Sequence, residues 1–286
     1  FQGQRKPGEF SILEEALLGI MGKKIIPWRL RNDGTIDKPY IAPNAPGLTL
    51  EAELGVGENA IPGPDFDIWE LKAIKQPSLS GASNTGSPCS RRSPTRMDNG
   101  TIQADFVLRY GHVSGTDENG NPDEYYFTSG DINRPGEDKE GAKLNLKLVG
   151  FTDAKHFDPN GMIALYDKQT GELAAGWSYL KLLEHWQRKH NRAAYVPYLR
   201  EKEDGKTTVE FGPLVTLGIS TSFGLFQKLQ DGKVIYDPGD KITLKDGKWT
   251  PHSRSQFRIN LNDISAIYQE VKEVDLRDSD SSQKEE

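Results

Sequence analysis

The sequence predicts an α/β protein in which helices flank a mixed β-sheet. Residues 9–20 and 176–190 have apolar side chains at helical spacing, and several short runs between residues 105 and 166 are typical of strands. A strand expected at 193–199 follows the second of these helices directly, which makes an αβ unit. Together these patterns indicate a sheet with helices packed against it.

The N-terminal part also contains a second helix and a buried strand. Three prolines and a glycine exclude regular structure between residues 39 and 47, and a short helix carrying Glu51 is expected at 48–54. Apolar residues within 66–74 indicate a buried strand. The other expected elements are strands at 105–112, 124–129, 144–151, 162–166, 233–237 and 241–244, and helices at 220–230 and 261–271.

The composition excludes several classes of protein. The 286 residues carry a formal net charge of −6, whereas proteins that coat nucleic acid without specificity are usually basic. The apolar runs are too short to cross a bilayer. The single cysteine, Cys89, provides neither a disulfide framework nor a cysteine zinc site. We therefore expect a soluble cytoplasmic protein.

Three segments of different character are expected along the chain. Residues 1–3 resemble the remnant of a cleavable tag, and residues 4–275 are expected to form one domain with two lobes. Residues 276–286 are expected to be an acidic disordered tail, as the end of an Asp-, Ser- and Glu-rich run that starts at Glu270.

A basic loop is expected between residues 76 and 100. The segment is rich in serine, proline and glycine, and it contains Arg91, Arg92 and Arg96. Such a loop could close over a polyanion.

The segment from Pro64 to Lys72 contains the residues that metal-dependent phosphodiester hydrolysis requires. That reaction needs a divalent ion to neutralise the phosphate, a polarised water, and a cation that holds or deprotonates the water. Glu70 and Lys72 are two residues apart, so on a strand their side chains point to the same face. Asp65 reaches that face only if a turn or bulge lies between it and Glu70. Asp65, Glu70 and the backbone carbonyl of Leu71 would then suffice as protein ligands for Mg²⁺.

A surface strand that carries a Glu/Lys ion pair is the alternative interpretation of this segment. Acids and bases are frequent in the chain, so such spacings also arise by chance. The apolar neighbours Phe66, Ile68 and Ile74 favour a buried strand instead, where an unpaired charge is costly. We therefore favour the functional interpretation.

The flanking residues resemble one group of nucleases. The stretches Thr49–Gly55, Pro64–Phe66 and Glu70–Ile74 are similar to the active-site region of MutH and of the MvaI/BcnI restriction endonucleases, which are PD-(D/E)xK nucleases. In that group a helical Glu, thirteen intervening residues before the Asp, completes the site, and Glu51 stands at that distance from the Asp; Glu53 is the competing candidate. The similarity continues in Arg192–Pro197, Gly232–Asp237 and Phe257–Ile259.

The resemblance implies a restriction-endonuclease-like fold with two lobes around a DNA cleft, and a Mg²⁺-dependent type II enzyme that cleaves double-stranded DNA at a specific sequence. Asp65 and Glu70 would bind Mg²⁺, Lys72 would position or activate the attacking water, and Glu51 would tune the site or help to bind a second ion. Products with 5′-phosphates, a monomeric enzyme and a cognate methyltransferase in the host follow from the same resemblance. A MutH-like nicking enzyme and a DNA-binding module without catalysis are the alternatives.

The resemblance also directs base recognition to a late segment around an expected turn and strand. Arginine can bridge guanine O6 and N7, and glutamine can pair with adenine. Lys241 and Lys245, like the arginines of the basic loop, could contact phosphates. A solvated hairpin is the alternative interpretation of this late segment. Residues 77–160 do not align with the family. The candidate base readers are His252, Arg254, Gln256 and Arg258.

Overall fold

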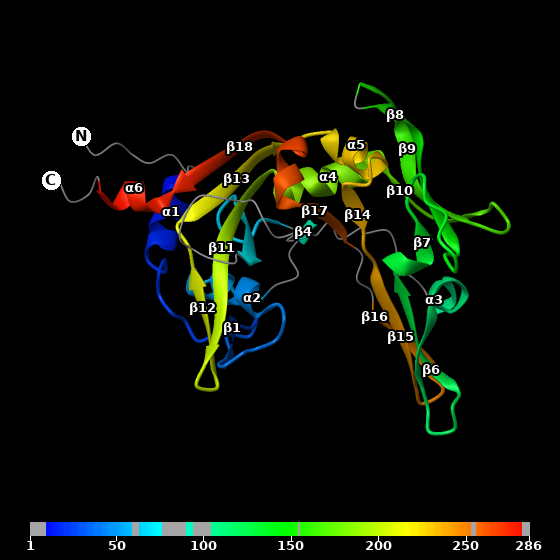
Figure 1. Ribbon diagram of the computed structural model, residues 1–286, viewed down its shortest axis with the longest axis horizontal. Helices are drawn as coiled ribbons and strands as arrows, with labels where there is room; N and C mark the ends of the chain where they lie inside the picture. Colours follow the sequence, from blue (N-terminus) through cyan, green and yellow to red (C-terminus); the bar gives the residue numbers. More distant parts are fainter. Residues whose placement is uncertain are drawn as a thin grey trace. The chain divides into compact units, whose positions relative to one another are not determined.

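Two compact units, each built from segments that are far apart in the sequence, make up the chain (Figure 1). The first unit comprises Phe1–Cys89, Gln187–Thr221 and Tyr268–Glu286, and the second comprises Ser90–Trp186 and Ser222–Ile267. The computed structural model describes residues 10–58, 63–75, 90–93, 104–153, 155–252 and 256–281.

A mixed sheet forms the centre of the first unit. Its strands are β3 (Glu70–Lys75), β11 (Arg192–Glu203), β12 (Lys206–Phe211), β13 (Leu214–Thr221) and β18 (Tyr268–Asp275). β3 lies parallel to β11, while β12, β13 and β18 pair antiparallel with their neighbours. A parallel pair needs a long connection, which is why β3 and β11 come from distant parts of the chain. The sheet is mixed, as the sequence predicts.

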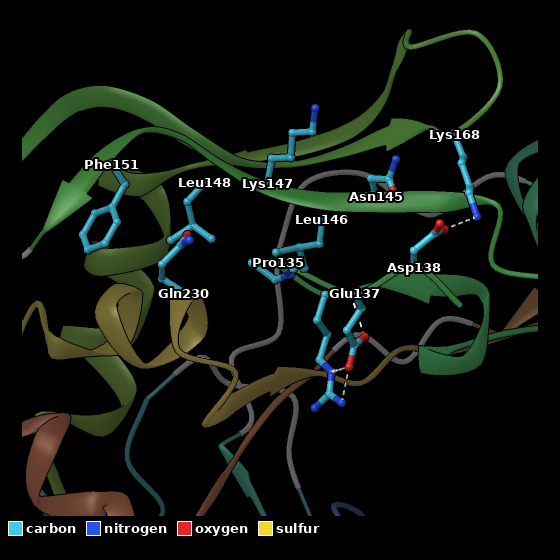
Figure 2. Close-up of a pocket in the computed structure, with 12 residues that line it drawn as sticks. Pro135, Glu137, Asp138, Asn145, Leu146, Lys147, Leu148, Phe151, Lys168 and Gln230 are labelled. Atoms are coloured by element: carbon cyan, nitrogen blue, oxygen red, sulfur yellow. Dashed lines mark hydrogen bonds and ion pairs between the residues drawn. The ribbon is translucent and has the colours of Figure 1, made fainter. Parts of the chain in front are cut away.

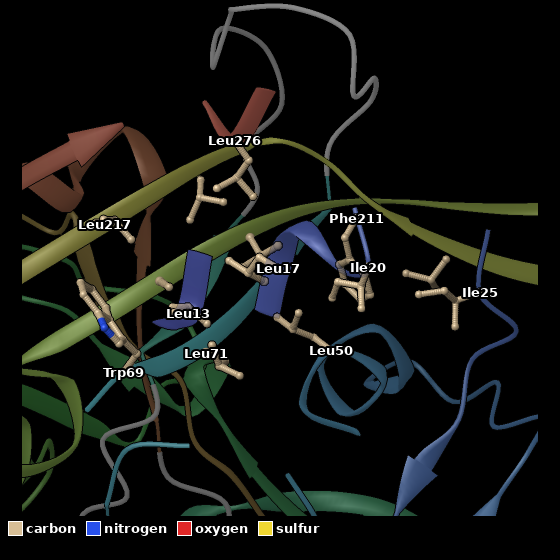
Figure 3. Close-up of a cluster of buried hydrophobic side chains, with 14 residues drawn as sticks. Leu13, Leu17, Ile20, Ile25, Leu50, Trp69, Leu71, Phe211, Leu217 and Leu276 are labelled. Carbon is tan, nitrogen blue, oxygen red and sulfur yellow. The ribbon is translucent and has the colours of Figure 1, made fainter. Parts of the chain in front are cut away.

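Apolar side chains of two helices cover one face of this sheet (Figure 3). The helices are α1 (Phe10–Leu18) and α2 (Ala45–Glu53). Leu13 and Leu17, four residues apart on α1, are fully buried in the same cluster as Leu71 of β3. Burying each leucine contributes about 2 kcal/mol. Because Leu71 faces this core, its neighbours Glu70 and Lys72 point to the opposite face of the sheet.

Helix α2 begins earlier than the expected segment 48–54. Pro46 occupies its first turn, where the missing N–H removes no intrahelical hydrogen bond. A short hairpin of β1 (Arg29–Leu30) and β2 (Ile36–Asp37) lies beside this helix. Within the ranges that the structure describes, no helix is long and apolar enough to cross a membrane.

Small sheets and short helices make up the second unit. One sheet contains β7 (Ile132–Asn133), β8 (Leu144–Asp153), β9 (His156–Asp167) and β10 (Leu173–Ser178). Another contains β4 (Ser90–Ser93), β14 (Val234–Tyr236) and β17 (Phe257–Asn260), and a further one β5 (His112–Thr116), β6 (Pro122–Thr128), β15 (Gly239–Lys245) and β16 (Lys248–His252). The helices are α3 (Ala104–Tyr110), α5 (Gly224–Gln230) and most of α4 (Tyr179–His190), whose last residues belong to the first unit.

The expectation of a strand at 105–112 is wrong, because most of this segment forms helix α3. Val107 and Tyr110 are buried and lie three residues apart, on one side of a helix. Phe106 packs edge-on against Phe127 at 5.1 Å between ring centroids. A short apolar run fits a strand and a helix equally well, and here packing against the sheet favours the helix.

The expectation of a helix over 261–271 is also wrong. Only Leu261–Ala266 is helical, as a 3₁₀-helix, and the chain then enters β18, which pairs with β13. The helix expected at 220–230 begins only at Gly224, and the strands β12 and β13 before it were not expected. Pairing with a distant strand determines these segments, and a local pattern does not encode it.

Regular structure continues beyond residue 275. Helix α6 (Leu276–Ser281) follows β18, and Leu276 is 1% exposed in the apolar core. The expected disordered tail is therefore wrong for these residues, because one leucine in an acidic segment inserts into the core. Residues 282–286 lie outside the described residues.

Candidate active site

Strand β3 places Glu70 and Lys72 side by side. Glu70 is 1% exposed, and the ammonium group of Lys72 forms an ion pair with Oε1 of Glu70. The two-residue spacing permits this contact because alternate residues of a strand point to one face. The buried carboxylate thus has a counter-ion on its own strand, without which its burial would be costly.

A tight turn returns Asp65 to the same site. Phe66 and Trp69 exchange two backbone hydrogen bonds, of 2.9 and 2.7 Å, and Asp67 between them has a left-handed φ of 50°. Oδ2 of Asp65 accepts a hydrogen bond from the Leu71 N–H at 3.0 Å. The turn that the spacing requires is therefore present. Since the N–H and C=O of a strand residue point to the same edge, the Leu71 carbonyl also points away from β11.

Helix α2 carries Glu51 into this group. Burial, followed by the negative charges of Asp65 and Glu70, raises the pKa of Glu51 to about 7, against the opposing effect of two lysines. The competing Glu53 instead accepts a hydrogen bond from the indole N–H of Trp28. The structure thus brings together all the predicted catalytic residues, which are Glu51, Asp65, Glu70 and Lys72.

A second lysine, Lys189, joins the carboxylates and was not expected. Its Nζ atom lies 3.8 Å from Oδ1 of Asp65 and 3.4 Å from Oε2 of Glu70. It comes from the last turn of α4, directly before β11, the strand that pairs with β3. The αβ unit expected at 176–199 gives part of this signal, because it places the end of the helix at the start of its strand; the pairing of that strand with β3 then brings Lys189 to the site.

The electrostatics of the site favour a cation. Burial and the charge of Glu70 raise the pKa of Asp65, while Lys72 and Lys189 oppose the shift. Oε2 of Glu70 is buried and accepts no hydrogen bond from the residues that the structure describes, although Lys189 lies within ion-pairing distance. Hard oxygen donors such as these carboxylates are the ligands that Mg²⁺ prefers. Three carboxylates and two lysines therefore leave an excess of negative charge that a divalent ion could neutralise.

A complete metal cluster is not formed by side chains alone. In the part of the chain that the structure describes, no group of three or more acidic, histidine or cysteine side chains could hold an ion. Mg²⁺ commonly keeps several waters and one or two carboxylate ligands, so Asp65, Glu70 and the carbonyl oxygen of Leu71 fit this ion without a third side chain.

The expected base readers that the structure describes differ in exposure and in location. His252 is exposed at the end of β16, whereas Gln256 is buried and its amide lies 3.5 Å from Oδ2 of Asp237. Nε of Arg258 on β17 lies 2.7 Å from the same oxygen. Arg254 lies outside the described residues. The structure thus joins Gln256 and Arg258 at Asp237 and places His252 on another sheet.

The expected phosphate contacts also differ in their surroundings. Lys241 forms an ion pair with Glu124 on the neighbouring strand β6, and Lys245 is exposed at the end of β15. Arg91 and Arg92 lie on β4, while Arg96 is outside the described residues.

A hollow of about 600 Å³ in the second unit contains none of the predicted site residues (Figure 2). Arg134 donates to Glu137 at 2.7 Å, and Lys168 lies 2.6 Å from Asp138. Since these charges in its lining are paired with one another, the hollow does not resemble the buried, electrostatically unbalanced group around Glu70.

Comparison with known proteins identifies the family. The sequence matches the model described as "MvaI/BcnI restriction endonuclease family" over residues 14–268, while no curated protein matches it. The solved "Restriction endonuclease MvaI-cognate DNA substrate complex" is similar at 18% identity with a TM-score of 0.64, over 94% of this chain and 99% of that chain. "Restriction endonuclease MvaI in the absence of DNA" has 17% identity and a TM-score of 0.43, over 95% and 99%. The similarity to the DNA complex confirms the expected fold class. Since the family match spans nearly all of the sequence, the chain belongs to the MvaI/BcnI family of restriction endonucleases, which are site-specific deoxyribonucleases.

Proposed function

We propose that this protein is a type II enzyme that hydrolyses phosphodiester bonds of double-stranded DNA at a specific sequence in a Mg²⁺-dependent reaction. The observation that carries this proposal is the pair of carboxylates formed by half-buried Asp65 and buried Glu70, with the ammonium group of Lys72 in contact with Glu70. The similar MvaI structure was solved with its cognate DNA substrate, which supports DNA as the partner.

Asp65, Glu70 and the backbone carbonyl of Leu71 would hold the Mg²⁺ ion. Bound there, the ion supplies charge neutralisation at the scissile phosphate and a more acidic water. The protein's contribution is a rigid arrangement of ligands: the Leu71 N–H fixes Asp65, and Lys72 fixes one oxygen of Glu70. Contacts of this kind orient the ligands, and their loss typically lowers metal affinity or activity by about 10- to 100-fold.

Lys72 would position or activate the attacking water. Its ammonium group contacts Glu70, and its side chain is 19% exposed to solvent. A cation at this place stabilises negative charge on the water as its proton leaves and on the phosphate oxygens. Glu51, with a pKa of about 7, changes its charge near neutral pH and would tune the net charge of the site.

Base recognition by the late segment is part of the same proposal. The guanidinium of Arg258 is held by Asp237, and a fixed guanidinium suits two hydrogen bonds to guanine. His252 is exposed and available for contact. Gln256 would have to leave its buried place before it could read a base, so we assign it the weakest role.

A cleavage assay tests the proposal. Plasmid and phage DNA, with and without base methylation, are incubated with Mg²⁺ and the wild-type protein, Lys72→Ala or Asp65→Asn. Discrete fragments with wild type only, and sequenced ends that share one motif, are the expected result. Equal inertness of all three proteins on every DNA would contradict the proposal, and nicked circles without linear product would indicate a nicking enzyme.

A further inference from the structure

Two adjacent rows of residues cross the sheet of the first unit on the face that carries the candidate active site. Glu70 on β3 pairs with Ala193 on β11, which pairs with Gly218 on β13. In the next row on the same face, Lys72 pairs with Tyr195. Directly paired residues point to the same side of a sheet, so both rows continue the active-site face across β11.

The ring of Tyr268 lies over the Gly218 end of the first row. A Cβ atom on Gly218 would stand 2.4 Å from Cε2 and 2.7 Å from Cζ of Tyr268. Non-bonded carbon atoms attract best at about 3.5–4.0 Å, and 2.4 Å is strongly repulsive. The ring can therefore occupy this place because Gly218 has no side chain and its neighbour Ala193 has a small one.

The hydroxyl of Tyr268 is held by a second buried tyrosine. It lies 3.1 Å from the hydroxyl of Tyr195, and both side chains are buried. Burial, the adjacent Tyr195 hydroxyl and the charge of Glu70 raise the pKa of Tyr268 well above its ordinary value. The influence of Glu70 on this phenol agrees with the row of pairs in placing the carboxylate near the ring.

Glu70 is the ligand that most needs such a neighbour. It is 1% exposed, and among the described residues its Oε2 atom has no hydrogen-bond donor. A buried carboxylate keeps a single orientation only if the surrounding groups fix it, and its partners Lys72 and Lys189 are long side chains with many rotamers. A rigid aromatic ring loses little conformational entropy when it packs beside such a carboxylate.

We propose that Tyr268, seated on Gly218 and held by the Tyr195 hydroxyl, is a positioning residue that closes the sheet side of the site and keeps Oε2 of Glu70 directed towards the metal ion. The inference rests on the proposed function for the identity of the reaction. It concerns metal affinity as well, and that property can be measured without DNA.

Metal titration of the full chain tests this inference. Mn²⁺ binding is measured by isothermal titration calorimetry for wild type, Gly218→Ala, Tyr268→Phe and Tyr268→Leu, and cleavage is measured over a range of Mg²⁺ concentrations. Loss of contacts behind a metal ligand typically costs about 10- to 100-fold in metal affinity. We expect about tenfold weaker binding for Gly218→Ala and Tyr268→Leu, a lower kcat with unchanged KM for DNA, and a smaller effect for Tyr268→Phe, which keeps the ring.

Val209→Ala is the matched control, because Val209 is fully buried in the core of the same unit, on β12. It should lower the melting temperature without changing Mn²⁺ affinity. Wild-type Mn²⁺ affinity in Gly218→Ala and Tyr268→Leu would overturn the inference, as would a wild type that binds no Mn²⁺. If Gly218→Ala does not fold, the Mn²⁺ affinities of the two Tyr268 variants test the inference. A wild type that binds Mn²⁺ but cuts no DNA would contradict the proposed function alone.

Discussion

Nζ of Lys189 lies 3.4 Å from Oε2 of Glu70, a buried oxygen that accepts no hydrogen bond within the described part of the chain. The same ammonium group lies 3.8 Å from Oδ1 of Asp65, so Lys189 forms ion pairs with both carboxylates. A cation bound by the two carboxylates would compete with Lys189 for the same oxygens. The stabilisation that a metal ion gives to the folded protein should therefore depend on whether Lys189 is present.

Replacing Lys189 by methionine should increase the stabilisation that Mg²⁺ provides. The metal-free variant loses a counter-ion of buried Glu70 and half-buried Asp65 and should melt at a lower temperature than wild type, while saturating Mg²⁺ should recover much of the loss. Thermal melts with EDTA and with Mg²⁺ measure the difference. Arg188→Met is the control, since Arg188 is an exposed neighbour on α4 and should change neither value. An equal Mg²⁺ shift in wild type and Lys189→Met would refute the linkage.

Lys72→Ala should abolish cleavage but not DNA binding. Removing a group that stabilises charge in the transition state lowers kcat by about 10²–10⁴-fold. Gel-shift affinity with Ca²⁺ in place of Mg²⁺ should stay within about threefold of wild type, since one phosphate contact contributes little to the total. Lys75→Ala is the matched control, because Lys75 lies three residues further along the same strand, on the other face, and is exposed. Retained cleavage by Lys72→Ala would remove it from the mechanism.

The Glu51→Gln variant should gain stability relative to wild type as the pH rises. Burial and neighbouring carboxylates raise the folded-state pKa of Glu51 from 4.5 to about 7, so the folded protein binds a proton that the unfolded chain releases. The stability that this proton contributes is present below the unfolded-state pKa and is lost as the pH rises through about 7, whereas glutamine is unaffected. Relative to wild type, the unfolding free energy of the metal-free variant should increase by about 2 kcal/mol between about pH 5 and pH 8.

Urea denaturation at a series of pH values checks this prediction. Glu53→Gln is the control, since its carboxylate accepts the Trp28 indole N–H and lies outside the cluster. A constant difference between Glu51→Gln and wild type over the whole pH range would show that Glu51 ionises normally.

The candidate site was largely predictable from sequence because most of its residues lie close together along the chain. Glu70 and Lys72 share a strand, and the need for a turn before Glu70 follows from parity alone. That turn exists, with Asp67 at its left-handed position. Lys189 was missed because its place depends on the parallel pairing of β11 with β3, which joins residues more than a hundred positions apart.

The fold was predictable at the level of class and less so for individual elements. Helix α1 and the strand β3 follow from their apolar periodicity, whereas α3 was mistaken for a strand because seven residues are too few to establish a period. Strands β12 and β13 and the division into two units depend on long-range contacts. The buried Gln256 shows the same limit, because a polar residue in a basic segment has no local feature that predicts its burial.

Asp67 should tolerate glycine but not valine. Its φ of 50° is accessible to glycine and, at modest cost, to aspartate and asparagine, whereas a β-branched residue is strained there. Asp67→Val should cost about 1–2 kcal/mol of stability and displace Asp65, lowering cleavage, while Asp67→Gly and Asp67→Asn should retain activity. Urea denaturation and cleavage rates measure both effects. Full activity of Asp67→Val would show that this turn does not control the position of Asp65.

Leu276→Ala should destabilise the first unit although it lies in an acidic C-terminal segment. The side chain is 1% exposed and belongs to the same cluster as Leu13 and Leu17. Truncating a buried leucine costs about 2–5 kcal/mol, whereas Arg277→Ala, which removes a surface ion pair with Asp275, should cost less than about 1 kcal/mol. Denaturant midpoints of the two neighbouring variants make the comparison. If both cost equally little, α6 does not contribute to the core, and the ordered chain ends with β18.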